Sequence, residues 1–599
     1  MQPADLQKSF LPTTRAEILA RGWDRPDIVL ITGDAYVDHP SFGISLIGRW
    51  LSHHGYRVAI LPQPYHLDAR SFKALPPPRL FCGITSGNLD SIVANYTGNG
   101  KVRDQDAYSP GGNPYFGEER LKKERRRPDR ATIRYTALAR EAWPGVPIIL
   151  GGLEASLRRF IHFDYQQERL RSSVLTDAKA DLVVYGMGEW SVLEIARRLD
   201  RNLPLTDIAG TCEKLTEREF AERQKLSPSM ILPSWDEIAR DPRQFMVAEQ
   251  DIDRACRAGS NKPLSQAQKS LFLWQNSPAA PLTPPELDQL YSLPFQRRPH
   301  PATPDVPAWR MIRDSITIVR GCSGNCSFCA ITRHQGPLVI SRSVDSITRE
   351  VREVAATDFF QGTISDLGGP TANLYGTSCA IGGCPKQDCF FPKLCKNLSP
   401  NEDRFLALLE RCSEIPGVKH IHISSGLRME LLLTTHRLLG KIIRDHLPGT
   451  MKIAPEHTDP EVLRLMHKPG GHLIREFLNT CRKIASQAGK EIRFTPYFIA
   501  SHPGCTEQHM AHLAAEIKQL GISVRQFQDF TPTPGTLATA MYVSGLDRDT
   551  GKPIPVAKNE LERRKQRQVL EGITLGKDKK SPGRKKHLPR ASWKTRKAT

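Results

Sequence analysis

The organisation of this chain is decided by the stretch GCSGNCSFC, residues 321–329. Its three cysteines, Cys322, Cys326 and Cys329, are separated by three and by two residues, in a run of small, turn-forming residues. The preceding ITIVR, residues 316–320, is mostly β-branched and predicts a buried strand. The cysteines therefore lie on the loop that leaves the carboxyl end of a strand, where α/β folds place their chemistry.

Three thiols on one loop indicate a metal site. Thiolates are soft ligands that suit iron–sulfur clusters, zinc or Cu(I). A structural zinc ion or a fully ligated four-iron cluster takes four protein ligands, and this loop offers three. A fourth ligand from elsewhere, such as His334, would complete a structural zinc site. The spacing alone leaves both kinds of site open.

The loop resembles that of the radical SAM superfamily, in its Cys-x3-Cys-x2-Cys spacing and in the aromatic Phe328 before the last cysteine. The resemblance implies a [4Fe–4S] cluster on Cys322, Cys326 and Cys329, with its fourth iron open for S-adenosylmethionine. It implies an enzyme that cleaves S-adenosylmethionine reductively and generates a 5′-deoxyadenosyl radical, on a substrate that the resemblance leaves unknown. A reductant such as flavodoxin or ferredoxin would supply the electron.

Length and composition limit the class of protein. A chain of 599 residues is too long for one core and predicts two or three domains. No run of eighteen apolar residues occurs, so no membrane span is expected. Seven of the thirteen cysteines lie between Cys322 and Cys395, which indicates metal in a reducing compartment. Since the N-terminus has no apolar signal region either, we expect a cytoplasmic protein.

The formal net charge of +20 is unevenly distributed. Residues 575–599 hold ten Lys or Arg and one acid, Asp578. A polybasic end attracts nucleic acid or an anionic surface. We favour a basic, disordered tail over 576–599 without a dedicated partner. The alternative is a metal-stabilised RNA-binding protein without radical chemistry, with zinc in its cysteine sites and RNA bound through the tail.

The first third of the chain alternates strand and helix patterns. Residues 1–205 are therefore predicted to form a Rossmann-like, doubly wound parallel sheet. The predicted strands are Ile28–Gly33, Tyr56–Leu61, Leu80–Thr85, Val146–Gly152 and Asp181–Gly186, with helices over Phe42–His53 and Glu189–Leu199. Residues 100–129 are Gly-rich and then densely charged, which predicts a long surface insertion with a solvated basic run at 125–127.

This half resembles the cobalamin-binding type of Rossmann domain that precedes many radical SAM cores. The turn Gly186–Glu189 fits that family. The family's cobalamin-ligating pattern, Asp-x-His-x-x-Gly, is not met, because DHPSFG at residues 38–43 places His39 one residue early. We therefore expect that this domain binds no cobalamin. The alternative function that does require cobalamin is that of a cobalamin-dependent methyltransferase. Residues 206–307 are predicted to form a helical and proline-rich connector, with amphipathic stretches at 217–224 and 265–274.

From residue 308 the pattern becomes regular. Six strand–helix units predict parallel strands that curl into a partial (β/α)6 barrel over 308–575, with a Cys-rich insertion at 375–398. The resemblance implies the same open barrel. The predicted strands are Ile316–Arg320, Phe359–Asp366, Val418–Ser424, Met451–Pro455, Glu491–Ile499 and Val524–Phe530. The predicted helices are Val344–Ala355, Asp403–Glu414, Met429–Arg444, Leu473–Ala488 and Thr506–Leu520.

Residues that follow the barrel strands line one mouth, and many of them are polar. Paired glycines let a ligand approach the backbone closely, hydroxyls can bond a ribose, and an arginine can bind a carboxylate with both of its nitrogens. The candidate cofactor-binding residues are Phe328, Gly368, Gly369, Pro370, Ser424, Ser425, Arg428 and Glu456. The catalytic residue is unknown, and two histidines at successive strand ends, His457 and His502, are candidates for substrate contact or proton transfer.

The strings at these strand ends match one family more closely than they match the superfamily. The chain resembles the YgiQ-type radical SAM proteins, a family whose reaction is not established. The resemblance covers nearly the whole chain and rests on APEH at 454–457, MHKPG at 466–470, ASHPG at 500–504, QDFTP at 528–532 and AMY at 540–542.

A second cysteine cluster lies in the insertion. Its residues are Cys379, Cys384, Cys389 and Cys395. Four thiols in seventeen residues of a cytoplasmic protein indicate a second metal site. The spacing is wider than in the usual Cys-x2-Cys zinc knuckle, so zinc and an auxiliary iron–sulfur centre both stay open.

Overall fold

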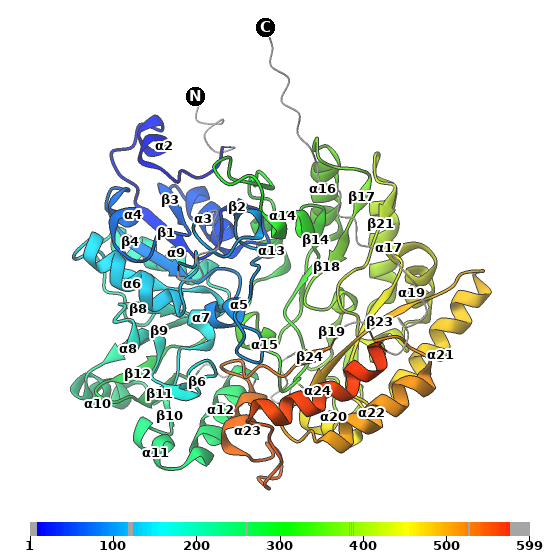
Figure 1. The fold of residues 1–599 in the computed structure, drawn as a ribbon. Coiled ribbons are helices and arrows are strands. Elements are labelled where there is room, and N and C mark those ends of the chain that lie inside the picture. Colours follow the sequence, from blue (N-terminus) through cyan, green and yellow to red (C-terminus); the bar gives the residue numbers. More distant parts are fainter. Residues whose placement is uncertain are drawn as a thin grey trace.

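The computed structural model describes residues 9–117, 124–257, 262–382, 384, 386, 388–524 and 527–575. The chain forms two α/β halves that pack side by side (Figure 1). The N-terminal half is drawn in blue to green, and the C-terminal half in green to red. The basic tail at 576–599 lies outside the described residues, so its two interpretations stay predictions.

The N-terminal half is built on a nine-stranded sheet. Its order is β10-β11-β12-β9-β8-β5-β4-β1-β3. The parallel strands are β1 (Ile28–Thr32), β3 (Val58–Pro62), β4 (Phe81–Thr85), β5 (Ile148–Leu150) and β8 (Leu182–Val184). The chain runs from β1 to β3 on one side and then crosses back to β4 on the other, so the strand order reverses between β1 and β4. The doubly wound sheet predicted from the sequence is confirmed.

Helices cover both faces of this sheet. Alternate residues of each strand point to opposite faces, so Leu30 and Val29 enter different cores. The face of Leu30 is covered by α3 (Gly43–His53) and α9 (Glu189–Asp200), and the face of Val29 by α6 (Ala131–Ala142).

The connector predicted over 206–307 continues the N-terminal sheet instead. The added strands are β9 (Thr211–Leu215), β10 (Met230–Leu232), β11 (Leu264–Ala267) and β12 (Phe272–Gln275). The stretch 265–274 is thus a hairpin and not a helix. Its polar residues are buried and satisfied: Gln266 Oε1 accepts a hydrogen bond from the Ile161 N–H at 3.0 Å, and Gln266 Nε2 donates one to the Pro233 carbonyl at 3.0 Å. Helices do follow in this region, namely α10 (Glu217–Leu226), α11 (Trp235–Arg240), α12 (Pro242–Arg257) and α13 (Pro284–Tyr291).

The predicted surface insertion at 100–129 also contributes to the interior. Arg127 is 2% exposed, and its guanidinium lies 2.6 Å from Asp34 Oδ1 and 3.0 Å from Asp106 Oδ2. The expectation of a solvated basic run is therefore wrong for Arg127. Local charge density does not reveal that the fold brings Asp34 and Asp106 onto this arginine, and those two carboxylates are what make a buried guanidinium tolerable.

The C-terminal half contains the predicted six parallel strand positions. These are β14 (Ser315–Thr317), β17 and β18 (Thr363–Ile364, Asp366–Gly368), β21 (His420–Ile421), β22 (Met451–Glu456), β23 (Phe494–Ala500) and β24 (Gln528–Asp529). Each pairs in parallel with the next, and an isolated parallel bridge between Leu427 and Ile453 links the third position to the fourth. The crossover helices are α16 (Val344–Ala355), α17 (Glu402–Ser413), α21 (His472–Gln487) and α22 (Glu507–Leu520).

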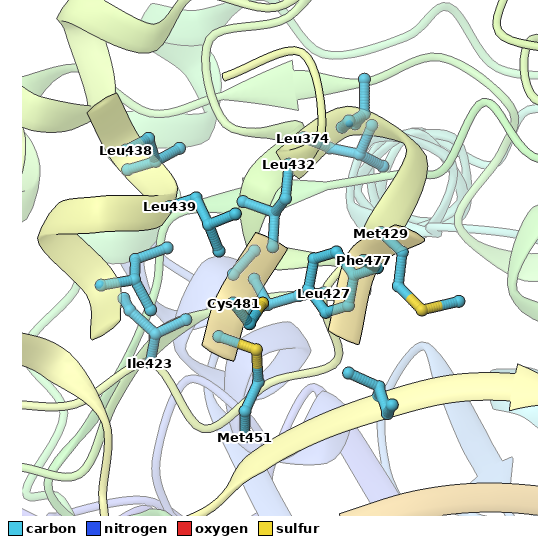
Figure 2. Close-up of a cluster of buried hydrophobic side chains, with 14 of the residues drawn as sticks. Leu374, Ile423, Leu427, Met429, Leu432, Leu438, Leu439, Met451, Phe477 and Cys481 are labelled. Atoms are coloured by element: carbon cyan, nitrogen blue, oxygen red, sulfur yellow. The ribbon is translucent and has the colours of Figure 1, made fainter. Parts of the chain in front are cut away.

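The helix predicted over Met429–Arg444 is broken. It consists of α18 (Met429–Leu432), α19 (His436–Lys441) and the π-helical turn η3 (Ile442–His446). The hydroxyls of Thr434 and Thr435 both donate to the Leu431 carbonyl, and such bonds compete with the helical backbone pattern. The pieces still bury one apolar face, where Leu427, Leu432 and Leu439 pack with Phe477 and Cys481 (Figure 2).

The two halves share a core and a buried ion pair. Ile92 and Phe163 of the N-terminal half pack with Phe530 and Met541 of the C-terminal half. Arg320 Nη1, just before the cysteine loop, lies 2.6 Å from Glu189 Oε1 at the start of α9. Within the described residues, no helix combines the length and apolar character needed to cross a bilayer.

Candidate active site

The loop with Cys322, Cys326 and Cys329 leaves β15 (Val319–Arg320), beside β14. It turns sharply at Gly321, whose φ is +80°, and a Cβ atom there would lie 1.8 Å from the Leu338 carbonyl oxygen. The Cys322 N–H donates to the Gly336 carbonyl at 3.3 Å, and the Cys329 N–H to the Cys326 carbonyl at 3.1 Å. The loop therefore needs glycine at 321, because any side chain would meet fixed backbone.

The middle of the loop is held at Ser327, which is 2% exposed. The Ser327 N–H donates to the Met466 carbonyl at 3.0 Å, and the Ala538 N–H donates to the Ser327 carbonyl at 2.8 Å. The Ser327 hydroxyl lies 3.2 Å from His502 Nε2. These three bonds come from three different segments, so the position of the cysteines is set by tertiary contacts.

His502, a catalytic candidate from the sequence, is buried and engaged at both ring nitrogens. Its Nδ1 lies 2.8 Å from the Pro503 carbonyl, which can only accept, so Nδ1 carries the proton and Nε2 accepts from the Ser327 hydroxyl. Burial lowers its pKa to about 3, so the ring is neutral at pH 7. His502 also contacts Phe328 edge-on, with ring centroids 6.3 Å apart.

Arg428 lies beside two of the thiols. Its Nη2 is 3.7 Å from Cys322 Sγ and 3.6 Å from Cys326 Sγ, and the guanidinium stacks on Phe390 at 4.1 Å. Arg428 Nη1 is 3.0 Å from Glu430 Oε1. These negative neighbours raise the pKa of Arg428 well above its ordinary value despite its burial. The arginine thus faces the thiols in this structure.

The residues around this loop fit an iron–sulfur cluster. Three soft donors share one loop, and a buried guanidinium can offset the negative charge of thiolates. Among the described residues, the buried Nε of Arg428 has no hydrogen-bond partner. In the described part of the chain, no three Cys, His, Asp or Glu side chains are grouped tightly enough to hold a single metal ion. A cluster does not require that grouping, since each cysteine binds a different iron.

His334, the fourth ligand of the zinc alternative, faces the N-terminal half. Its Nδ1 lies 3.1 Å from Ser156 Oγ. Burial lowers the pKa of His334 to about 4, so the ring is neutral at pH 7. His334 lines a cavity between the two halves, as described below.

The Gly-Gly and Ser-Ser candidates meet at one corner of the barrel mouth, around Asp366. Asp366 Oδ1 accepts from the Ser424 and Ser425 N–H groups at 2.7 and 3.1 Å, and Oδ2 accepts from the Ser425 hydroxyl. A Cβ at Gly368 would lie 2.0 Å from Ser425 Oγ. Burial raises the pKa of Asp366. Sequence reasoning did not nominate Asp366, although it stands at a strand end with the other candidates.

Glu456 and His457 follow β22. Glu456 has φ +66°, which is unusual for a residue other than glycine, and burial raises the pKa of its carboxyl. His457 Nδ1 accepts from the Asp459 N–H at 3.0 Å, and its Nε2 lies 3.7 Å from Cys505 Sγ. Burial lowers the pKa of His457 to about 4. Both nitrogens of His457 thus have protein partners, as those of His502 do.

The insertion with the second cysteine cluster packs against the first loop. The Cys389 N–H donates to the Ser323 carbonyl at 3.3 Å. The guanidinium of Arg428 stacks on the ring of the next residue, Phe390. The hairpin β19–β20 (Ser378–Cys379 and Leu398–Ser399) closes the insertion, and the Cys395 N–H donates to the Cys389 carbonyl at 2.9 Å. Burial and the neighbouring thiols of Cys395 and Cys379 raise the pKa of Cys389 to about 11.

A cavity of about 670 Å³ lies between the two halves. Its N-terminal wall includes residues at the carboxyl ends of β1, β4, β5 and β8, and its C-terminal wall includes Gly369 and Pro370. Arg320 and Ala330, which flank the cysteine loop on either side, also line it. The cavity therefore reaches the two ends of the cysteine loop, although residues 321–329 themselves are not among its lining residues.

Comparisons with known proteins agree with this division of the chain. The family model described as Radical SAM N-terminal matches residues 10–315, and the one described as Radical SAM superfamily matches residues 316–517. The UPF0313 protein of Geobacter sulfurreducens is 44% identical over 94% of this chain and 92% of its own length. The UPF0313 protein of Thermotoga neapolitana is 44% identical over 95% of this chain and 100% of its own length.

Among solved structures, one similar fold is the radical S-adenosylmethionine methyltransferase TsrM from Kitasatospora setae. It was solved with cobalamin and a [4Fe–4S] cluster bound. It covers 85% of this chain and 76% of its own, at 13% identity and a TM-score of 0.49.

Proposed function

Because this chain belongs to the UPF0313 family and contains the two radical SAM domains, we propose that it is a radical SAM enzyme. Cys322, Cys326 and Cys329 would hold a [4Fe–4S] cluster, which, once reduced, would supply the one electron for cleavage of S-adenosylmethionine to methionine and a 5′-deoxyadenosyl radical. The observation that carries the proposal is the three-thiol loop at a barrel mouth, with a buried arginine beside two of its sulfurs.

The chain's own groups have distinct tasks in this proposal. Arg428 offsets the charge of the thiolates, and Ser327 with His502 fixes the loop. The corner formed by Asp366 and Ser425 offers a carboxylate and a hydroxyl for the amino group and ribose of S-adenosylmethionine, and Gly368 leaves the room in which these two side chains meet. A flavodoxin or ferredoxin is the proposed electron donor.

The experiment is anaerobic purification of the full chain, followed by iron and sulfide analysis and by assay of 5′-deoxyadenosine with dithionite. We expect a brown protein that forms 5′-deoxyadenosine and loses both properties on Cys322→Ala. The matched control is Cys412→Ala, a fully buried thiol in the core of the C-terminal half. Colourless, zinc-loaded protein that binds RNA and does not cleave S-adenosylmethionine would support the RNA-binding alternative instead.

We also propose a second metal centre in the insertion, held by Cys379, Cys389 and Cys395 together with Cys384. The hairpin β19–β20 and the backbone bond between Cys395 and Cys389 support it. Thiolates suit both zinc and an iron–sulfur centre. In the described residues these thiols are not grouped tightly enough for a single ion, so a zinc site requires them to draw closer together. Metal analysis of Cys389→Ala distinguishes them: loss of zinc identifies a zinc site, loss of iron and sulfide an auxiliary cluster, and unchanged metal content contradicts a second centre.

No cobalamin ligated by His39 is part of this proposal. The Nδ1 of His39 accepts from the Ser41 N–H at 3.1 Å, and its Nε2 has no hydrogen-bond partner among the described residues. Because His39 is fully buried, cobalt would reach Nε2 only after a rearrangement. Added hydroxocobalamin is therefore expected to show no spectrum of a histidine-ligated corrinoid. Such a spectrum, absent from His39→Ala, would favour the methyltransferase alternative.

A further inference from the structure

The cavity between the two halves has the position of a ligand site. In open α/β sheets, ligands bind outside the carboxyl ends of the strands, where the strand order reverses. Here that point lies between β1 and β4, and Thr32 and Thr85 at their ends both line the cavity. The cavity lining continues along the carboxyl edge of this sheet with Gly151 and Gly152 after β5 and Gly186 after β8. A volume of about 670 Å³ falls in the range of organic-ligand pockets.

The charges on the cavity wall are already paired. The lining residues with an acidic or basic side chain are Asp34, Glu189, Arg320 and His334, and the lining also includes the phenols of Tyr108 and Tyr291. Asp34 is paired with Arg127 at 2.6 Å, and Glu189 with Arg320 at 2.6 Å. His334 is bonded to Ser156 and is neutral at pH 7. In the described part of the chain, the lining therefore has no unpaired cation for a phosphate or a carboxylate.

The remaining wall is mainly apolar, with a few uncharged polar groups. Aliphatic and aromatic side chains come from the sheet and from α3, and they include Ile44, Ile47, Phe81, Ile149 and Val184. Uncharged hydrogen-bonding groups come from Thr85, Asn88 and Gln335. Such a wall favours an apolar body with hydroxyl, amide or carbonyl groups, and it disfavours a charged nucleotide.

From this geometry we infer that the cavity binds the substrate, and that the substrate is an uncharged, largely apolar organic molecule. Its reactive end would lie at the barrel side of the cavity, where Arg320 and Ala330 flank the cysteine loop and Gly369 follows the second strand. The assignment of this ligand as the substrate of radical chemistry rests on the proposed function. The inference that the cavity binds an uncharged apolar molecule is independent of that function.

Gly151 provides a way to fill the cavity without straining the backbone. Its φ and ψ are −155° and −177°, an extended conformation open to any residue. A Cβ atom there has no neighbour within 4 Å. Gly151→Leu therefore places a side chain in the open space, and Gly151→Ala is the matched control at the same position.

The binding test uses Nile red, an uncharged aromatic dye, with the full chain carrying its cluster. We expect saturable binding to the wild type, an affinity loss of about tenfold or more in Gly151→Leu, and little change in Gly151→Ala. Cys322→Ala should bind the dye like the wild type, because the cavity does not depend on the cluster. Equal binding by wild type and Gly151→Leu would overturn the inference.

The substrate test measures 5′-deoxyadenosine with dithionite and S-adenosylmethionine, while two fractions of a cell extract are added separately. One fraction holds uncharged, solvent-extractable molecules, and the other holds anions retained by anion exchange. We expect a several-fold rise over the rate without extract with the first fraction only, and loss of that rise in Gly151→Leu. A rise with the anionic fraction alone, or with neither, refutes the substrate class. No 5′-deoxyadenosine under any condition refutes the proposed function, and the dye result then still decides the binding site.

Discussion

The Nε2 atom of His502 accepts a hydrogen bond from the Ser327 hydroxyl at 3.2 Å. Ser327 lies between Cys326 and Cys329, whereas His502 follows β23, 175 residues later in the chain. Since the other ring nitrogen donates to Pro503, the imidazole has one fixed orientation. The cysteine loop is therefore locked from the opposite side of the barrel by a neutral histidine.

Replacing this histidine should loosen the loop without dismantling the fold. In His502→Phe the ring still packs edge-on against Phe530, but the Ser327 hydroxyl loses its partner in a buried place, at a cost of about 1–3 kcal/mol. We expect faster iron release to a chelator and less 5′-deoxyadenosine. His512→Phe, at an exposed position of α22, is the control. Iron release equal to the wild type would mean that this bond does not hold the loop.

The turn at Gly321 predicts a more severe effect. Its φ of +80° and the Leu338 carbonyl, 1.8 Å from an added Cβ, mean that Gly321→Ala must shift backbone. We expect destabilisation of at least about 1–3 kcal/mol, with lowered iron content, because the loop is displaced. Gly426→Ala, where a Cβ meets nothing within 4 Å, should match the wild type. Denaturant unfolding and iron analysis measure both effects, and full iron content in Gly321→Ala would contradict the turn's role.

Arg428 should tune the reduction potential of the proposed cluster. Its guanidinium lies within 3.7 Å of two thiol sulfurs, and reduction adds negative charge there. Removing the positive charge in Arg428→Met should lower the potential by roughly tens of millivolts, since charge near a cluster is one of the quantities that set it. An anaerobic titration followed by electron paramagnetic resonance measures this shift.

Arg428→Met leaves Glu430 buried without its partner. The control is therefore the double variant with Glu430→Gln, which keeps the charge removal and relieves the unpaired carboxylate. Arg428→Lys retains the charge and should stay closer to the wild-type potential. An unchanged potential in both Met variants would exclude an electrostatic role for Arg428.

His162 predicts a pH dependence of stability that is separate from the cluster. Burial and the nearby Arg158 lower its pKa to about 3, below the value of about 6.5 in an unfolded chain. The unfolded state thus binds the extra proton first, so stability is lost as the pH falls from about 6.5 towards 3. His162→Gln should flatten this decline by up to about 1.4 kcal/mol per pH unit. Thermal unfolding at pH 7, 6 and 5 tests it, and parallel curves for both proteins would contradict it.

The periodic elements were predictable because their signal is local. Helix α16 spans the predicted Val344–Ala355, and the strand–helix units of both halves appear in order. Hydrophobic periodicity reports which face of a segment is buried, whatever covers it. The same periodicity could not show that the stretch 265–274 pairs with β9, or that Thr434 and Thr435 break a helix.

The candidate site likewise has features that the local sequence predicts and features that depend on contacts between distant segments. By itself, the sequence determined the doubly wound sheet, the six-strand barrel and the three-cysteine loop at the end of a strand, because these depend on neighbours in the chain. Only the tertiary structure decided what surrounds that loop: Arg428 beside the thiols, His502 on Ser327, Asp366 at the serine corner, and Arg127 buried against Asp34. The physical reason is that buried charges and polar groups are stabilised by partners brought from distant segments, and no local pattern specifies those partners.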